Sequence, residues 1–177
     1  TVSTDPGAEI PNVEVPPPLD RVYACDEKVK IDMQLPGCPP NPELIGEVIV
    51  ALAEGRVPVL PGKSVCDTCP TKREGKGMVD KVKRFINNVE FKPGTPIDEM
   101  RCLLEQGYMC MGPVTVAGCA KRGGPSCISA RVPCRGCFGP VRRDGNQLLD
   151  MMNGLVSNGL DFKSVVDRRS VLRFSGA

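Results

Sequence analysis

The chain has 177 residues, a length that suits one ordinary domain or two small ones. Its net charge is only +2, which argues against a dedicated nucleic-acid binder, and no apolar run approaches the length of a bilayer span. The sequence has no histidine, so it cannot itself supply a Ser-His-Asp triad, a Cys-His protease pair or a histidine ligand to zinc or haem. Its ten cysteines must therefore be explained without histidine.

The first 35 residues predict an extended segment followed by a strand. Residues 1–24 are rich in proline and lack periodicity, which is typical of a segment that crosses a surface in an extended conformation. Residues 28–35 alternate apolar and polar side chains, with Val29, Ile31 and Met33 on one face. This alternation predicts a strand with one buried face.

A helix is predicted over residues 42–52. Asn41 can cap it, Pro42 suits its first turn and Gly55 its end. Its expected apolar face consists of Leu44, Ile45, Val48, Ile49 and Leu52. Cys38 therefore falls in a tight loop between strand and helix, where open α/β sheets place their ligands.

Beyond Pro61 the sequence favours loops with a few short helices. Periodicity predicts helices at about 76–88, about 97–106 and 145–158. The 19 glycines and 18 prolines of the chain favour turns, and five Phe, two Tyr and no Trp leave little material for an aromatic core. We expect ligated metal clusters to supply the missing interior.

The cysteines allow three interpretations. A secreted disulfide framework suits an even count, but the chain is long for that class. Structural zinc would use the two Cys-x2-Cys pairs, Cys66/Cys69 and Cys134/Cys137, although the 64 residues between them exceed the usual spacing. Iron–sulfur ligation fits better, because the eight cysteines from Cys66 onward form two complete sets of four thiolates. Cys25 is interpreted as a small buried apolar residue.

Three motifs in fixed order resemble a known family. The stretches LPGCPPNPE, CLLEQGYMCMGPVTVAGC and PCRGCFGP resemble the small subunit of [NiFe] hydrogenases, above all the cytoplasmic methyl-viologen-reducing branch linked to heterodisulfide reductase. The resemblance covers residues 10–145. It implies an α+β protein: residues 1–60 would be the end of a flavodoxin-like α/β domain, and residues 61–177 a loop-rich, partly helical iron–sulfur domain.

The resemblance also assigns cluster ligands. Cys66, Cys69, Cys102 and Cys110 would hold a distal [4Fe–4S] cluster. Cys119, Cys127, Cys134 and Cys137 would hold a medial one, where Cys127 replaces a proline that leaves many relatives with [3Fe–4S]. Cys38 would be one ligand of a proximal [4Fe–4S] cluster whose other ligands are not in this chain. We therefore expect the chain to be the C-terminal portion of a longer subunit.

The implied function is electron transfer in a cytoplasmic hydrogenase. No residue of this chain would be catalytic, because dihydrogen would be split at the nickel–iron centre of a large-subunit partner. The clusters would pass electrons to an iron–sulfur or flavoprotein partner, with heterodisulfide reductase as a candidate. A group of basic residues would offset the clusters' negative charge or steer an acidic partner: Lys121, Arg122, Arg131, Arg135, Arg142 and Arg143.

Two alternatives stay open. One is the small subunit of a deazaflavin-reducing hydrogenase, which keeps the clusters and changes the electron acceptor. The other is a zinc-stabilised interaction module without redox function. A nucleic-acid role for the basic residues ranks below both, because stacking aromatics are missing beside them.

Overall fold

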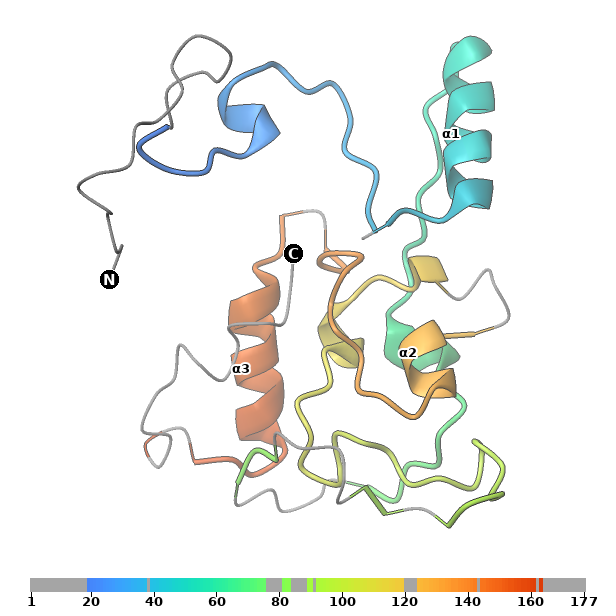
Figure 1. The fold of residues 1–177 in the computed structure, drawn as a ribbon, viewed down its shortest axis with the longest axis vertical. Coiled ribbons are helices and arrows are strands. Elements are labelled where there is room, and N and C mark those ends of the chain that lie inside the picture. Colours follow the sequence, from blue (N-terminus) through green and yellow to red (C-terminus); the bar gives the residue numbers. More distant parts are fainter. Residues whose placement is uncertain are drawn as a thin grey trace, which may run out of the picture. The chain divides into compact units, whose positions relative to one another are not determined.

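The computed structural model describes residues 19–37, 39–75, 81–83, 89–90, 92–119, 124–142, 144–161 and 163 (Figure 1). The chain divides into two compact units, Thr1–Gln34 and Leu35–Ala177. Each unit is described by itself below.

The described part of the first unit contains one short 3-10 helix, η1 (Cys25–Glu27). Arg21 and Lys28 both make cation–π contacts with the Tyr23 ring. Arg21 Cζ lies 4.0 Å from the ring centroid and Lys28 Nζ lies 3.6 Å from it. Arg21 also pairs with Glu27. These contacts fold the segment on itself around Tyr23.

The strand predicted over residues 28–35 is wrong. This stretch has no strand pairing, and Val29 and Ile31 are exposed rather than buried. A strand requires a neighbour that accepts and donates its backbone hydrogen bonds, and no such neighbour lies among the described residues. Alternating polarity alone therefore does not make this segment a strand.

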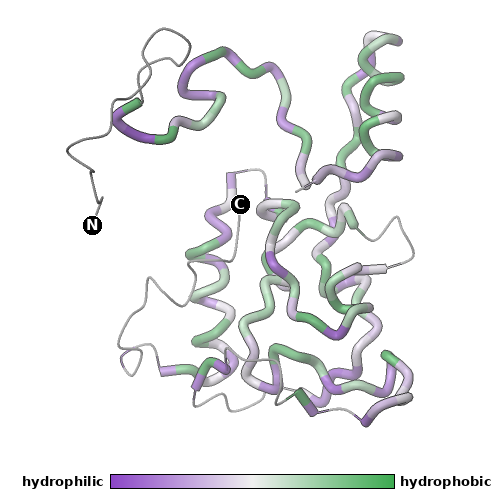
Figure 2. Tube along the Cα trace, in the orientation of Figure 1, coloured by the Kyte–Doolittle hydropathy of each residue, from purple (hydrophilic) through white to green (hydrophobic). Residues whose placement is uncertain are grey.

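Helix α1 (Pro42–Ala53) confirms the predicted helix and its cap. The Glu43 N–H donates to Asn41 Oδ1 at 3.1 Å, and Pro42 occupies the first turn. The buried stripe differs from the predicted one: Leu44, Val48 and Ala51 are buried. Of the predicted face, Ile45, Ile49 and Leu52 are exposed. α1 therefore has more hydrophobic residues than it buries, and most of the helix is green in Figure 2.

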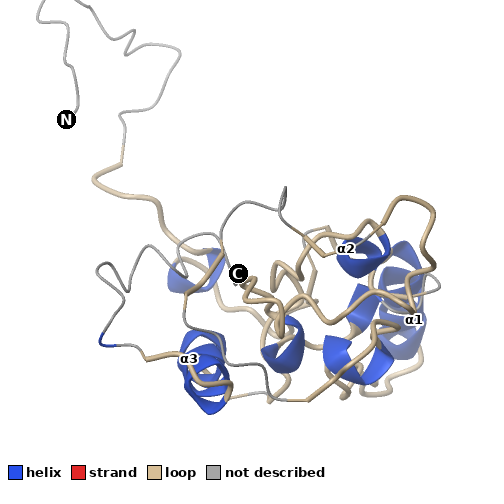
Figure 3. Cartoon of the chain, turned by 90° about the horizontal axis from the view of Figure 1, so that it is seen from below, coloured by secondary structure: helices blue, strands red, loops and turns tan. Residues whose placement is uncertain are grey.

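The rest of the second unit is loop-rich and partly helical, as predicted. Among the described residues, its helical elements include η2 (Val65–Thr68), η4 (Gly112–Val114), α2 (Ser126–Ser129) and α3 (Gln147–Ser157). Long loops join these elements (Figure 3). In the described stretches, sheet-like pairing is confined to four isolated bridges: Ser64–Val116, Lys72–Arg101, Lys83–Tyr108 and Thr115–Pro140.

The helix predicted over residues 97–106 is wrong, and the reason is a tertiary hydrogen bond. In a helix, the Cys102 N–H would donate four residues back; here it donates to the Lys72 carbonyl at 2.8 Å. Lys72 N–H in turn donates to the Met100 carbonyl at 2.9 Å. The segment is therefore a series of turns. The helix predicted at 76–88 lies mostly outside the described residues.

Helix α3 confirms the prediction over 145–158. Asn146 caps it by accepting the Leu149 N–H at 3.0 Å. Met151 and Leu155 are buried in the core, together with residues that surround the cysteines. The buried Gln147 amide donates to Thr115 Oγ1 at 2.8 Å and so fastens α3 beside η4. None of the helices in the described ranges is long and apolar enough to cross a bilayer.

Candidate metal centre

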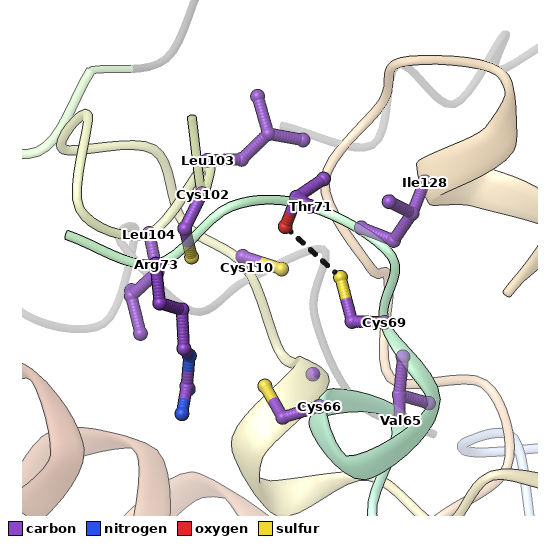
Figure 4. A pocket seen from close by; sticks show the side chains of 11 residues that line it. Val65, Cys66, Cys69, Thr71, Arg73, Cys102, Leu103, Leu104, Cys110 and Ile128 are labelled. Carbon is purple, nitrogen blue, oxygen red and sulfur yellow. Dashed lines mark hydrogen bonds between the residues drawn. The ribbon is translucent and has the colours of Figure 1, made fainter. Parts of the chain in front are cut away.

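Four cysteines line one pocket of the second unit (Figure 4). They are Cys66, Cys69, Cys102 and Cys110, the set that the resemblance assigns to one cluster. They come from η2 and its end and from the turns between residues 101 and 110, so the fold joins positions up to 44 residues apart. Their sulfurs lie around the pocket rather than at one point (Figure 4).

The turn that carries Cys66 and Cys69 is fixed by a reciprocal cap. Ser64 N–H donates to Asp67 Oδ2 at 2.8 Å, and Asp67 N–H donates to Ser64 Oγ at 3.3 Å. Val65 N–H donates to the Thr115 carbonyl at 2.8 Å, which ties the turn to η4. The Cys-x2-Cys pair therefore sits on a preformed turn with both thiols facing the pocket.

Cys102 and Cys110 are held from the opposite side. The bridge between Lys72 and Arg101 fixes the backbone of Cys102. Cys110 precedes Met111, whose N–H donates to the Cys134 carbonyl at 3.0 Å. Both side chains are almost fully buried.

Several groups hydrogen-bond to the sulfurs. Thr71 Oγ1 lies 3.1 Å from Cys69 Sγ, and the Cys134 N–H donates to Cys110 Sγ at 3.4 Å. The Gly112 N–H also bonds Cys110, and the Gly136 N–H bonds Cys134. Such donors stabilise ionised sulfur and tune an iron–sulfur centre.

Burial raises the pKa of three of the thiols. It raises the pKa of Cys66 to about 12 and that of Cys134 to about 11, and it also raises the pKa of Cys110. A metal that binds these three sulfurs must therefore displace their protons, and its positive charge would offset the cost of burying the thiolates.

A single zinc ion and a [4Fe–4S] cluster need different spacings of the four sulfurs. At a zinc–sulfur bond of 2.3 Å, four tetrahedral sulfurs lie only about 3.8 Å apart. Within the described residues, no three candidate ligands form a group that could hold one metal ion. A [4Fe–4S] cluster takes one thiolate on each of four irons, and four cysteines line this pocket.

The second set is brought together in part. Cys134 is close enough to Cys127 and Cys119 for their charges to raise its pKa, after burial as the main cause. Cys137 lies in a turn closed by the Gly139 N–H on the Gly136 carbonyl at 3.1 Å. Cys134 also neighbours Cys110 of the first set, so the two sets adjoin.

The remaining cysteines are Cys38 and Cys25. Cys38 lies outside the described residues. Cys25 is exposed, so its interpretation as a buried apolar residue is wrong: it starts the short η1 turn, which leaves its side chain uncovered. The nine described cysteines form no disulfide.

Two of the basic residues predicted near the clusters bond groups other than cysteines. Arg131 donates to the Thr95 carbonyl and contacts Met100 Sδ at 3.7 Å, and Arg142 pairs with Asp150 at 2.9 Å. Lys121, Arg122 and Arg143 lie outside the described residues.

Sequence reasoning missed Thr71 and Arg73 at the pocket, and Glu105, which accepts backbone N–H groups just beyond Arg73. Thr71 and Arg73 follow the first Cys-x2-Cys pair directly in CDTCPTKR, which is the one local signal that could have found them.

Gly112 has no side chain, and this keeps the four-cysteine pocket open beside Cys66 and Cys110. A Cβ at this position would lie 3.1 Å from Cys66 Sγ and 3.5 Å from Cys110 Sγ. Gly112→Ala should therefore lower iron retention by about 10- to 100-fold in affinity, as changes around metal ligands do. Iron release to a chelator measures this. Gly154→Ala is the control, because its Cβ meets nothing within 4 Å; equal retention in both variants would contradict the prediction.

No family model matches the chain. Among curated proteins, it is 40% identical over 172 residues to a subunit of the vhu-type F420-non-reducing hydrogenase of Methanocaldococcus jannaschii, covering 97% of this chain and 56% of that protein. It is 38% identical over 129 residues to the iron–sulfur subunit of the F420-non-reducing hydrogenase of Archaeoglobus profundus, covering 70% of this chain and 38% of that one. The chain spans about half the length of the first relatives it matches.

A shorter relative is matched over most of its own length. The corresponding F420-non-reducing hydrogenase subunit of Methanothermus fervidus is 31% identical over 107 residues, which cover 59% of this chain and 76% of the relative. This likeness across most of a relative, together with the higher identity to longer ones, places the chain in the family of F420-non-reducing hydrogenase iron–sulfur subunits.

Proposed function

We propose that this chain carries electrons within a [NiFe] hydrogenase, as its iron–sulfur subunit. The observation that carries the proposal is the pocket lined by Cys66, Cys69, Cys102 and Cys110. Chain segments far apart in sequence bring four thiols to one place. The Thr71 hydroxyl hydrogen-bonds Cys69 Sγ, and the Cys134 N–H donates to Cys110 Sγ. Four thiolates around one pocket are what a [4Fe–4S] cluster requires.

The chain's own residues would set the conditions for electron transfer. When bound, the cluster supplies reversible one-electron chemistry. The thiolates fix its position, burial of Cys102 and Cys110 keeps water away, and donors to sulfur set its potential. Each dihydrogen molecule split in a partner large subunit yields two protons and two electrons, so this chain would carry two electrons, one at a time.

Cys119, Cys127, Cys134 and Cys137 would hold the second, medial [4Fe–4S] cluster. The support is the proximity of Cys134 to Cys119 and Cys127, and of Cys134 to Cys110 in the other set. Two clusters ligated by neighbouring cysteines would form a short path for electrons.

Cys38 would contribute to a third, proximal cluster together with ligands outside this chain. In the sequence it lies three residues before Asn41, the cap of α1, at the position that the resemblance assigns to this ligand. In this proposal, residues 1–60 are the end of a flavodoxin-like domain and residues 61–177 the cluster domain.

The electron acceptor would be an iron–sulfur or flavoprotein partner in the cytoplasm, with heterodisulfide reductase as the leading candidate. The relatives' names describe hydrogenases that do not reduce F420. This favours such an acceptor over the deazaflavin-reducing alternative. The described cysteines form no disulfide, which suits a reducing compartment.

Hydrogen-driven bleaching tests the proposed relay. The complete complex, purified without oxygen, should be brown and should lose visible absorbance under dihydrogen as its clusters are reduced. The same subunit without its large-subunit partner should bleach with dithionite but not with dihydrogen. Absorbance that stays constant under dihydrogen, in a complex whose nickel–iron centre still exchanges hydrogen isotopes, would refute the relay.

A further inference from the structure

One positively charged side chain lies at the edge of the four-cysteine pocket. Arg73 lines this pocket and lies on the side of Cys102 and Cys66, across from Cys69 (Figure 4). The charges of Cys66 and Cys102 raise the pKa of its guanidinium, and Cys66 is the largest cause. Arg73 therefore places its positive charge beside two of the four cysteines.

The backbone holds Arg73 in this place from both sides. Just before it, Lys72 is bridged to Arg101, and the Cys102 N–H donates to the Lys72 carbonyl at 2.8 Å. This backbone pairing places Arg73 beside Cys102 and does not depend on the Arg73 side chain.

Just after Arg73, a buried carboxylate clamps the chain. Glu105 accepts the N–H groups of Glu74 at 2.9 Å and of Gly75 at 3.1 Å, and only 9% of Glu105 is exposed. Gly75 has a φ of +121°, which glycine adopts without strain. Glu105 also attracts the Arg73 guanidinium. A buried charge with these partners marks a fixed element.

The charge of a guanidinium beside a cluster has a definite redox effect. A [4Fe–4S] core of charge +2 with four thiolates has a net charge of −2, and one-electron reduction brings it to −3. A nearby positive charge stabilises the more negative state, so it raises the reduction potential.

We propose that Arg73 tunes the cluster held by Cys66, Cys69, Cys102 and Cys110, raising its reduction potential through the positive charge that Arg73 places at the edge of the pocket. This inference rests on the proposed function. It assigns a role to a residue that ligates no iron, and it makes this cluster a better electron acceptor than it would be without that charge.

The test compares variants of the full-length subunit in the intact hydrogenase complex. Arg73→Gln keeps a hydrogen-bond donor but removes the charge. Potentials are measured by redox titration followed by electron paramagnetic resonance. At a fixed potential, the reduced-to-oxidised ratio of this cluster should fall by about tenfold, which is a shift of about −59 mV for one electron. The second cluster serves as an internal reference.

Two further variants make the result specific. Arg73→Lys keeps the charge and loses the planar fork, so its shift should have the same sign and be smaller. Arg56→Gln removes one positive charge from a residue that pairs with Glu54 outside the pocket, and it should leave both potentials unchanged.

Each outcome either supports or overturns the inference about Arg73. Unchanged potentials in Arg73→Gln with full iron content would overturn the inference, and so would loss of iron from both Arg73 variants, which would show a role in assembly. If only Arg73→Gln loses iron, the Arg73→Lys potential decides: a fall supports the inference and an unchanged value overturns it. A wild-type complex without a [4Fe–4S] signal would refute the proposed function instead.

Discussion

Replacing Cys66 and Cys69 together with alanine should remove about four irons per chain. Only Cys102 and Cys110 would remain in the pocket, and two thiolates cannot hold a cube that takes four. Hydrogen-dependent reduction of the natural acceptor should fall by at least about 100-fold, because changes outside the ligand shell alone cost 10- to 100-fold. Iron analysis and acceptor assays measure both effects.

A matched control separates ligand loss from cysteine loss. Cys25 is exposed and lines no part of the four-cysteine pocket, so Cys25→Ala should keep full iron and activity. Hydrogen-isotope exchange at the large subunit should survive in both proteins. An unchanged iron content in the double variant would remove Cys66 and Cys69 from the ligand set.

The second large effect is expected from Cys127→Pro. If Cys127 is a ligand of the medial cluster, three cysteines remain and the cluster should become [3Fe–4S], with one iron fewer and a higher potential. Cys127 lies in the first turn of α2, after Pro125, where a proline fits without breaking a helical hydrogen bond. The Val132 N–H can still donate to the carbonyl of residue 127.

Electron paramagnetic resonance of the oxidised variant should reveal the new [3Fe–4S] signal. Hydrogen uptake with a high-potential dye should persist, while electron flow to a low-potential natural acceptor should fall. Cys127→Ala should give the same spectrum, because the effect comes from the lost thiolate. Without a new signal and with the iron count unchanged, Cys127 would not be a ligand.

Local signals predicted α1 and α3. Asn41 caps α1 by accepting the Glu43 N–H two residues ahead, within the reach of sequence reasoning. The prediction of α3 came from the spacing of its apolar residues. The same reasoning failed at 97–106, where the N–H of Cys102 bonds Lys72, 30 residues earlier in the chain. It failed at 28–35 because a strand depends on a partner that its own sequence does not reveal.

At the candidate site, too, sequence reasoning found some features and missed others. Spacing alone yielded eight cysteines in two sets, and the membership of each set came from the resemblance. The pocket brings one of these sets together, and Cys134 brings together part of the other. Arg73 follows the first Cys-x2-Cys pair closely in sequence, but its place beside Cys102 arises from the Lys72–Arg101 bridge. Glu105 could not be predicted, because its role arises from hydrogen bonds to residues 30 and 31 positions earlier in the chain.

The most direct test of an iron–sulfur role is the metal and sulfide content of the full-length subunit, purified in its complex without oxygen. We expect about four irons and four acid-labile sulfides for each set of four cysteines, so about eight of each for the two sets in this chain. We also expect a [4Fe–4S] resonance signal on reduction. One or two zinc ions per chain, with no labile sulfide, would contradict an iron–sulfur role and support a zinc-stabilised interaction module.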